Sequence, residues 1–450
     1  MPLHVFSDQV ALHQQVTAFF YIFATLGVFL GVIAIALIDA GFVDRKNLMD
    51  TIAQKMLCAF IAGTCFMLVG YGIWNYQYYQ AFGVPNGMRQ ALSDWWLAGG
   101  NLTTFAQNID PAGTPEADTF QVFSVFFFCF SALTAALIHG AGLERIKPAA
   151  SFITAAFVGG VMVPLLSYLT YGSVSPLTNA GLHDFVGAYC LYMLVGVWAL
   201  VLAWRLGPRL SIPSGPRNPM LAAGGFFALL LAIPMFVIGC GFLTPEAGYF
   251  GPTMTTSGLG IIFTNVFMSF AGGALSGSWL AYKKHKPLYV LSGPVAGYLA
   301  CTALFDLVVP WQALLIALCG PFILVGGEAL MRRLKIDDPK VVPLALGPSI
   351  FSTLMAGWVG AGVPQGGYPG ITDGAFAYQH AHVSFGTQLE GVVIVIAISA
   401  VAALIVSLLI EKTVGLRVSA HDEQMGLDAV YWNATAQEPS GALHPQANAV

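Results

Sequence analysis

The chain alternates between long apolar runs and short polar connections. Each run is long enough to cross the roughly 30 Å hydrocarbon core of a membrane as a helix. The eleven predicted spans are residues 16–40, 53–75, 119–142, 149–171, 185–206, 219–243, 256–282, 288–306, 311–331, 341–363 and 388–411. This pattern predicts an all-α polytopic membrane protein with eleven transmembrane helices.

The basic residues orient the predicted spans. Of the 18 Lys and Arg residues, all but Arg89 fall on one side, beside odd-numbered connections or after the last span. Since cytoplasmic loops carry the excess of Lys and Arg, we expect the N-terminus outside the cell and the C-terminus inside it. Residues 1–411 then form the transmembrane domain, and residues 412–450 form a cytoplasmic tail.

The composition argues against most other classes of protein. Hydrophobic residues make up 57% of the chain and charged residues only 9%, whereas soluble domains carry about 25% charged residues. The sequence has no Gly-rich phosphate loop, nucleophile elbow or paired catalytic carboxylates in a soluble setting. We therefore expect neither an enzyme nor a nucleic-acid-binding protein, and no cofactor.

Three stretches resemble the ammonium transporter (Amt/Rh) family. They are GFVDRKNLMDTIAQK at 41–55, FSALTAALIHGAGLERIKPAASF at 130–152 and KTVGLRVSAHDEQMGLDAVYW at 412–432. Shorter matches are LHDFVGAYCLYMLVG at 182–196, IGCGF at 238–242 and KIDDPKVVPLALG at 335–347. The matches follow the family's order over nearly the whole chain.

The resemblance implies a fold of two inverted five-helix repeats around a central path, with an eleventh helix outside them. It also implies a homotrimer that passes ammonium, ammonia or another small neutral solute. We expect its location to be the bacterial inner (cytoplasmic) membrane. The tail resembles the family's cytoplasmic region, which implies coupling between subunits and a PII-type regulator as a partner.

Two positions at the centre of the implied path depart from the family. Asp184 starts the fifth span and Asp338 the tenth, each eight residues before the position in question. Inverted repeats bring equivalent positions together at the midplane, so Tyr192 and Leu346 are expected to face one another. The family usually has a histidine pair there, which can relay a proton. Leucine cannot do so, and a phenol with a pKa near 10 is a poor relay, which predicts electroneutral passage.

Other residues along the implied path keep the family's pattern only in part. Phe130 and Phe242 align with the two phenylalanines that gate the path on its outer side. Tyr171 and Glu246 replace a Trp and a Ser of the outer recruitment site, where a ring face and a carboxylate would still attract a cation. A solvated loop acid is an equal alternative for Glu246. For Asp184 we favour a structural role as a helix cap over direct ligand binding.

The outer loop 364–387 contains His380 and His382, with Asp373 nearby. Imidazole and carboxylate ligands would suit copper or zinc. Their spacing in a Gly-rich loop is nonspecific, so no metal site is predicted.

Two functions remain open at this point. The first is a conduit for ammonia or another small neutral molecule, which the retained Phe130 and Phe242 favour. The second is a non-conducting binding protein, either a sensor or the accessory subunit of a larger membrane complex. Tyr192 and Leu346 favour the second function, because a bulky pair would plug the path. An ion channel is disfavoured, since no midplane carboxylates or carbonyl signals would coordinate a bare cation.

Overall fold

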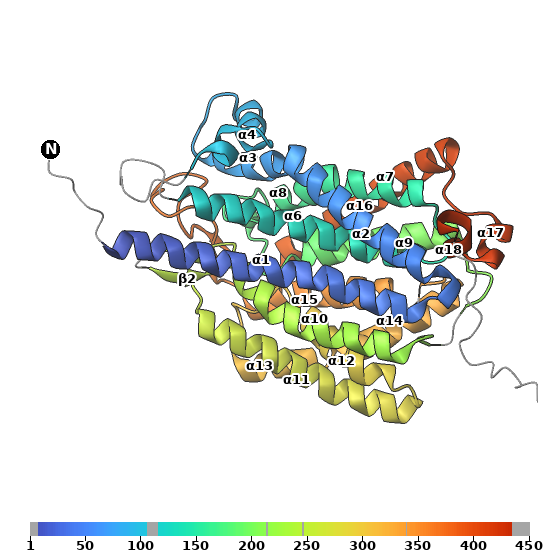
Figure 1. Cartoon of the computed structure of the whole chain (residues 1–450). Helices are drawn as coiled ribbons and strands as arrows, with labels where there is room; N and C mark the ends of the chain where they lie inside the picture. Colours follow the sequence, from blue (N-terminus) through green and yellow to red (C-terminus); the bar gives the residue numbers. More distant parts are fainter. Residues whose placement is uncertain (1–7, 106–115, 213–214, 245–246, 339, 434–450) are drawn as a thin grey trace, which may run out of the picture.

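The computed structural model describes residues 8–105, 116–212, 215–244, 247–338 and 340–433. Its long helices run side by side (Figure 1). The first half contains α1 (Asp8–Phe42), α2 (Leu48–Cys65), α3 (Tyr71–Ala81), α6 (Ala117–His139), α7 (Pro148–Phe157), α8 (Val163–Thr170) and α9 (Leu194–Leu206). The second half contains α10 (Pro219–Gly239), α11 (Leu259–Lys284), α12 (Leu288–Leu299), α13 (Pro310–Ala317), α14 (Gly320–Leu334) and α15 (Val341–Val359), and α16 (Phe385–Thr413) follows.

The shorter elements gather at the two ends of this bundle. We call one the tail end, where α17 (Ala420–Met425) and α18 (Leu427–Trp432) lie, and the other the loop end, where α1 begins (Figure 1). The loop end carries α4 (Gly87–Trp95) and α5 (Gly100–Thr103). It also carries two antiparallel strand pairs, β1 (Phe242–Thr244) with β2 (Gly248–Phe250) and β3 (Pro364–Gln365) with β4 (Ala381–His382).

Ten helical segments in the described part of the chain are long and apolar enough to cross a membrane. The predicted span 288–306 is the exception, because only Leu288–Leu299 is helical there. The non-helical backbone that follows is buried in protein, where its carbonyl groups find partners. The side-chain amide of Asn265 donates to the carbonyl oxygens of Phe305 and Val308, at 2.8 and 2.7 Å. Irregular backbone at membrane depth is stable only under such conditions.

Three of the spans contain a π-helical turn, in which one extra residue per turn shifts the register of the side chains. These turns are η2 (Phe66–Gly70), η4 (Val158–Met162) and η6 (Ala188–Met193). The first two pack closely, since a Cβ at Gly70 would lie 3.1 Å from the carbonyl oxygen of Gly159. Small residues allow such approach between membrane helices.

The tail helices dock on the connection between α1 and α2. The carboxylate of Asp428 accepts hydrogen bonds from the backbone N–H groups of Met49, at 3.0 Å, and Asp50, at 2.7 Å. The side-chain oxygen of Asn47 accepts from the N–H of Leu427 at 2.8 Å. Asp428 therefore satisfies amides at the start of α2, where a helix leaves its first N–H groups free.

A buried ion-pair network joins the other connections at the tail end. Arg209 Nε lies 2.8 Å from Asp337 Oδ2, and Arg145 Nη1 lies 3.3 Å from the same oxygen. Arg209 also reaches Glu144, at 3.1 Å. Burial raises the pKa of Asp337, but the hydrogen bonds and charge of Arg209, with the charge of Arg145, outweigh burial and hold this pKa below its usual value.

Replacement of Asp428 by Ala should loosen the tail. Loss of a capping carboxylate costs about 1–2 kcal/mol, so trypsin should cut after Arg417 roughly tenfold faster while the membrane helices stay intact. Gln424→Ala, at an exposed position of α17, is the matched control. Equal cleavage rates in the two variants would contradict a docking role for Asp428.

Candidate functional site

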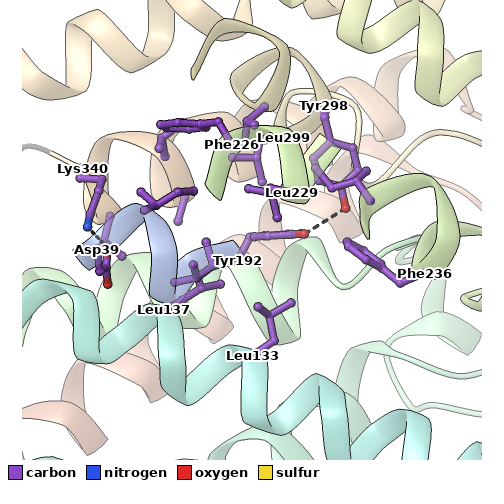
Figure 2. Close-up of a pocket in the computed structure, with 17 residues that line it drawn as sticks. Asp39, Leu133, Leu137, Tyr192, Phe226, Leu229, Phe236, Tyr298, Leu299 and Lys340 are labelled. Atoms are coloured by element: carbon purple, nitrogen blue, oxygen red, sulfur yellow. Dashed lines mark hydrogen bonds and ion pairs between the residues drawn. The ribbon is translucent and has the colours of Figure 1, made fainter. Parts of the chain in front are cut away.

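A cavity of about 80 Å³ lies in the interior of the bundle. It is bounded by α1, α6, α10, α12, α15 and the η6 turn, and most of its lining is apolar (Figure 2). The apolar lining residues are Ile35, Ile38, Leu133, Leu137, Phe226, Leu229, Ile233, Phe236, Val295, Leu299, Val341, Leu344 and Ala345. The polar ones are Asp39, Tyr192, Tyr298 and Lys340. One water needs roughly 10–15 Å³ by this measure, so several water-sized molecules fit.

The hydroxyl groups of Tyr192 and Tyr298 are hydrogen-bonded to each other at 2.9 Å. Their rings meet edge to face, with centroids 6.1 Å apart, and the edge of Phe236 contacts Tyr298. Both phenols are buried, and pairing removes the cost of an unsatisfied buried hydroxyl. Tyr192 therefore lines the cavity, and its place at the membrane midplane stays a prediction. Sequence reasoning missed its partner Tyr298, which lies in the short α12 and carries no signal in its spacing.

Asp184 and Asp338 both accept hydrogen bonds from backbone N–H groups at the start of helical segments. Asp184 accepts from the N–H groups of Ala188 and Tyr189, at 2.8 and 2.9 Å. Asp338 accepts from those of Lys340, Val341 and Val342. The first cap therefore bonds four and five residues ahead and the second bonds two to four residues ahead. The two helices consequently differ in register.

Leu346 does not line the cavity with Tyr192. A Cβ on Gly196, one helical turn after Tyr192, would lie 2.6 Å from the Cβ of Leu346. The neighbours Leu344 and Ala345 line the cavity instead. Tyr192 belongs to the η6 π turn, whereas α15 is α-helical. The residue eight positions after Asp184 and the residue eight positions after Asp338 therefore do not occupy equivalent places in the two helices. A pore-lining role for Leu346 stays a prediction.

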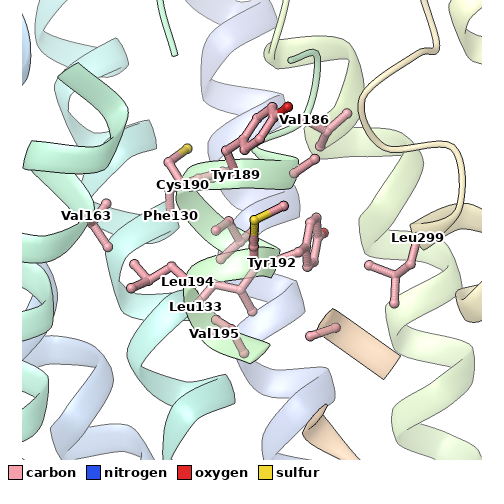
Figure 3. Packing of buried hydrophobic residues seen from close by; sticks show 14 of the residues in the cluster. Phe130, Leu133, Val163, Val186, Tyr189, Cys190, Tyr192, Leu194, Val195 and Leu299 are labelled. Carbon is pink, nitrogen blue, oxygen red and sulfur yellow. The ribbon is translucent and has the colours of Figure 1, made fainter. Parts of the chain in front are cut away.

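Phe130 lies one turn from the cavity on α6, towards the loop end. Its ring stacks on that of Tyr171, with centroids 6.2 Å apart and an interplanar angle of 26°. Figure 3 shows Phe130 and Leu133 with the buried side chains around Tyr192. The hydroxyl of Tyr171 donates to the carbonyl of Phe185 at 3.3 Å, which fixes the stack.

The structure does not bring the two predicted gate residues into one stack. Phe242 belongs to β1, and its ring centroid lies 5.6 Å from that of Phe123, which is about two helical turns from Phe130 towards the loop end of α6. Glu246, the second residue of the predicted recruitment site, lies outside the described residues. The gate and recruitment roles therefore stay predictions.

One of the two loop histidines, His380, bonds to another side chain. His380 Nε2 lies 2.9 Å from the side-chain oxygen of Asn179, and His382 stands in β4. His183 is buried between Asp306, at 2.9 Å, and Gln365, at 2.8 Å. Burial alone would lower the pKa of His183. The charge of Asp306 and the hydrogen bonds to Asp306 and Gln365 together have the larger effect, so this pKa lies above its usual value. Within the described ranges, no three His, Cys, Asp or Glu side chains cluster as metal ligands would.

Comparison with known proteins identifies the family. The sequence profile of the Ammonium Transporter Family matches residues 18–437. The chain belongs to the ammonium transporter family. Ammonium transporter Amt1 of Methanocaldococcus jannaschii is 25% identical over 428 residues, which cover 94% of this chain and 97% of that protein. The ammonium transporter of Mycobacterium bovis is 27% identical over 428 residues, covering 88% of this chain and 84% of the relative.

Solved structures of ammonium transporter proteins share this fold. A structure described as "Sensor Amt Protein" superposes with a TM-score of 0.72 at 20% identity and covers 93% of this chain and 99% of its own. Mep2 of Candida albicans superposes with a TM-score of 0.70 at 18% identity, covering 90% and 87%. This ammonium transporter family member is accordingly an integral membrane protein.

Phenylalanine at Tyr192 or Tyr298 should lower stability by about 1 kcal/mol, because each change leaves the other hydroxyl unpaired. The double variant should cost less than the sum of the single ones. Thermal unfolding in detergent, followed by tryptophan fluorescence, measures these effects. Tyr282→Phe, on the exposed end of α11, is the control. Strictly additive shifts would mean that the two hydroxyls do not interact.

Proposed function

We propose that this protein is a conduit through which ammonia, or another small neutral molecule, crosses the membrane without net charge. The observation that carries the proposal is the mainly apolar cavity with the phenol pair Tyr192–Tyr298 in its lining. Membership of the ammonium transporter family supplies the substrate class. Passage of a solute through such a conduit requires no catalysed reaction.

The chemistry of the cavity favours a neutral solute. Transfer of a bare cation into an apolar site costs several kcal/mol even after relaxation. Separate movement of a proton would need a relay, and the cavity lining of the described residues contains no histidine. A phenol gives up its proton only near pH 10 in water. Ammonia itself has the size and hydrogen-bonding capacity of water, so it fits both the volume and the hydroxyl groups.

Phe130 is proposed as a gate residue on the loop-end side, with Tyr171 as its partner in the stack. Their rings would have to separate for a solute to enter the cavity, and a ring flip of this kind needs no change in the backbone. Phe242 is proposed as the second gate residue, and Glu246 as a member of the outer recruitment site together with Tyr171. The face of Tyr171 would attract a cation before it loses its proton.

The alternative is a non-conducting sensor or an accessory subunit of a larger membrane complex. The two bulky rings of Tyr192 and Tyr298, paired in the cavity lining, support this alternative, because they would plug the path unless they rearrange. The shared fold with a protein titled as a sensor is a second, weaker support. A measurement of flux separates the two functions.

We also propose the finer topology and assembly. The ten long spans, with the short α12 as an eleventh crossing, would place the loop end outside and the tail end in the cytoplasm. Two inverted repeats, a homotrimer and a bacterial inner membrane location follow the family resemblance. Residues 412–450 are proposed to form a regulatory tail that couples subunits and receives a PII-type regulator, after the transmembrane domain of residues 1–411.

Proteoliposomes test the electroneutral conduit. An inward ammonia gradient should raise the internal pH faster than in protein-free liposomes, as followed by stopped-flow fluorescence. The same preparation on a solid-supported membrane should give no ammonium-dependent current, since the cavity has no proton relay. A saturable current would contradict electroneutral passage, and an absence of both signals would favour the non-conducting alternative.

Cysteine labelling tests the topology. Asp373→Cys, in the loop-end segment 364–387, should react with a membrane-impermeant maleimide on intact cells, because that segment is proposed to face outwards. Gln424→Cys in α17 is the matched control and should react only after lysis. Reaction in the reverse order would overturn the proposed orientation.

A further inference from the structure

Three ionisable side chains, Asp39, Lys55 and Lys340, meet at the tail end of the cavity. Lys55 Nζ of α2 lies 2.6 Å from Asp39 Oδ2 of α1. The other oxygen, Asp39 Oδ1, pairs with Lys340, which directly precedes α15. Asp39 and Lys340 line the cavity, and Figure 2 shows them at the end opposite to Tyr298. We call these three residues the charged seal.

The two lysines of the charged seal are held differently. Lys55 is fully buried and also donates to the carbonyl oxygen of Ala136, at 2.5 Å. The side chain of Lys340 is 13% exposed, and its Nζ lies 5.0 Å above the ring of Phe42. Lys340 is therefore the member that reaches solvent, and its ion pair is the one that water weakens most.

The charged seal contains two ammonium groups and one carboxylate, so the carboxylate keeps a counter-ion when one lysine moves away. A buried carboxylate without a counter-ion is strongly disfavoured. If Lys340 were the sole partner of Asp39, its departure would strand that charge. Lys55 remains paired with Asp39 when Lys340 moves away, so the buried end stays neutral. Lys340 can consequently leave the site without a large electrostatic penalty.

We propose that Lys340 is a tethered cation that closes the tail end of the cavity by occupying Asp39. Its ammonium group presents to the carboxylate the same N–H donors as a small free ammonium ion, so the chain itself fills this cation site. Solute passes when Lys340 swings off Asp39 into solvent while Lys55 stays in place. This inference rests on the proposed function as a conduit, and the positive charge at the exit also excludes cations.

The proposal predicts opposite effects for the two lysines. Lys340→Met removes the tethered cation and should raise ammonia flux in proteoliposomes on the order of tenfold, as expected from loss of one partly buried ion pair. Lys55→Met leaves Lys340 as the only counter-ion of Asp39 and should lower the flux. A merely structural role would lower flux in both variants. Lys340→Gln and Lys55→Gln repeat the test if a methionine variant does not reach the membrane.

A second measurement keeps the test independent of wild-type conduction. Ala345 lines the cavity. In an Ala345→Cys variant, mass spectrometry can follow how fast the new thiol is modified by methyl methanethiosulfonate added at the tail end. Labelling should be faster with Lys340→Met and slower with Lys55→Met. Unchanged labelling in both backgrounds would overturn the charged seal even if neither protein conducts. Flux in the wild type with no increase in Lys340→Met would overturn the seal but leave the conduit standing.

Discussion

Lipid offers no hydrogen bonds, and this constraint decides where every polar group of the protein lies. Backbone at membrane depth must pair internally, so the chain folds as helices. Where it does not, Asn265 reaches the carbonyl groups of Phe305 and Val308. Helix starts inside the bundle need acceptors, which Asp184 and Asp338 supply. The same requirement explains why the polar side chains of the cavity occur as pairs.

Much of the fold was predictable because the constraint acts on long stretches of sequence. Ten of the predicted spans correspond to long apolar helical segments, within about four residues at each end except for the second, where the helical segment Arg45–Ala81 extends well beyond the predicted 53–75. The span 288–306 could not be predicted as a short helix, because an apolar run looks the same whether lipid or protein surrounds it. Only the contacts of its buried C-terminal half, made by residues far away in sequence, allow the helix to stop at Leu299.

The site was predictable only where local sequence determines it. Tyr192 lines the cavity, whereas Leu346, at the same count from Asp338, packs beside Gly196 and is not among the lining residues. The π turn η6 changes the register by an amount that apolar periodicity does not reveal. Likewise, Lys55 was counted as one of the basic residues that flank the spans, and the structure shows it fully buried against Asp39.

The phenol pair and the charged seal both disfavour the passage of a cation. Between them lies apolar lining, so a cation in transit would lose its hydration and gain no carboxylate, because Asp39 already holds two ammonium groups. A histidine relay would offer a separate route for the proton, but a lysine at the exit would then repel that proton. Because Tyr192 and Tyr298 occupy the place of a relay, the proposed transport moves no proton along this path, and the repulsion does not slow it. The phenol pair and the charged seal therefore both favour the proposed passage of a neutral solute.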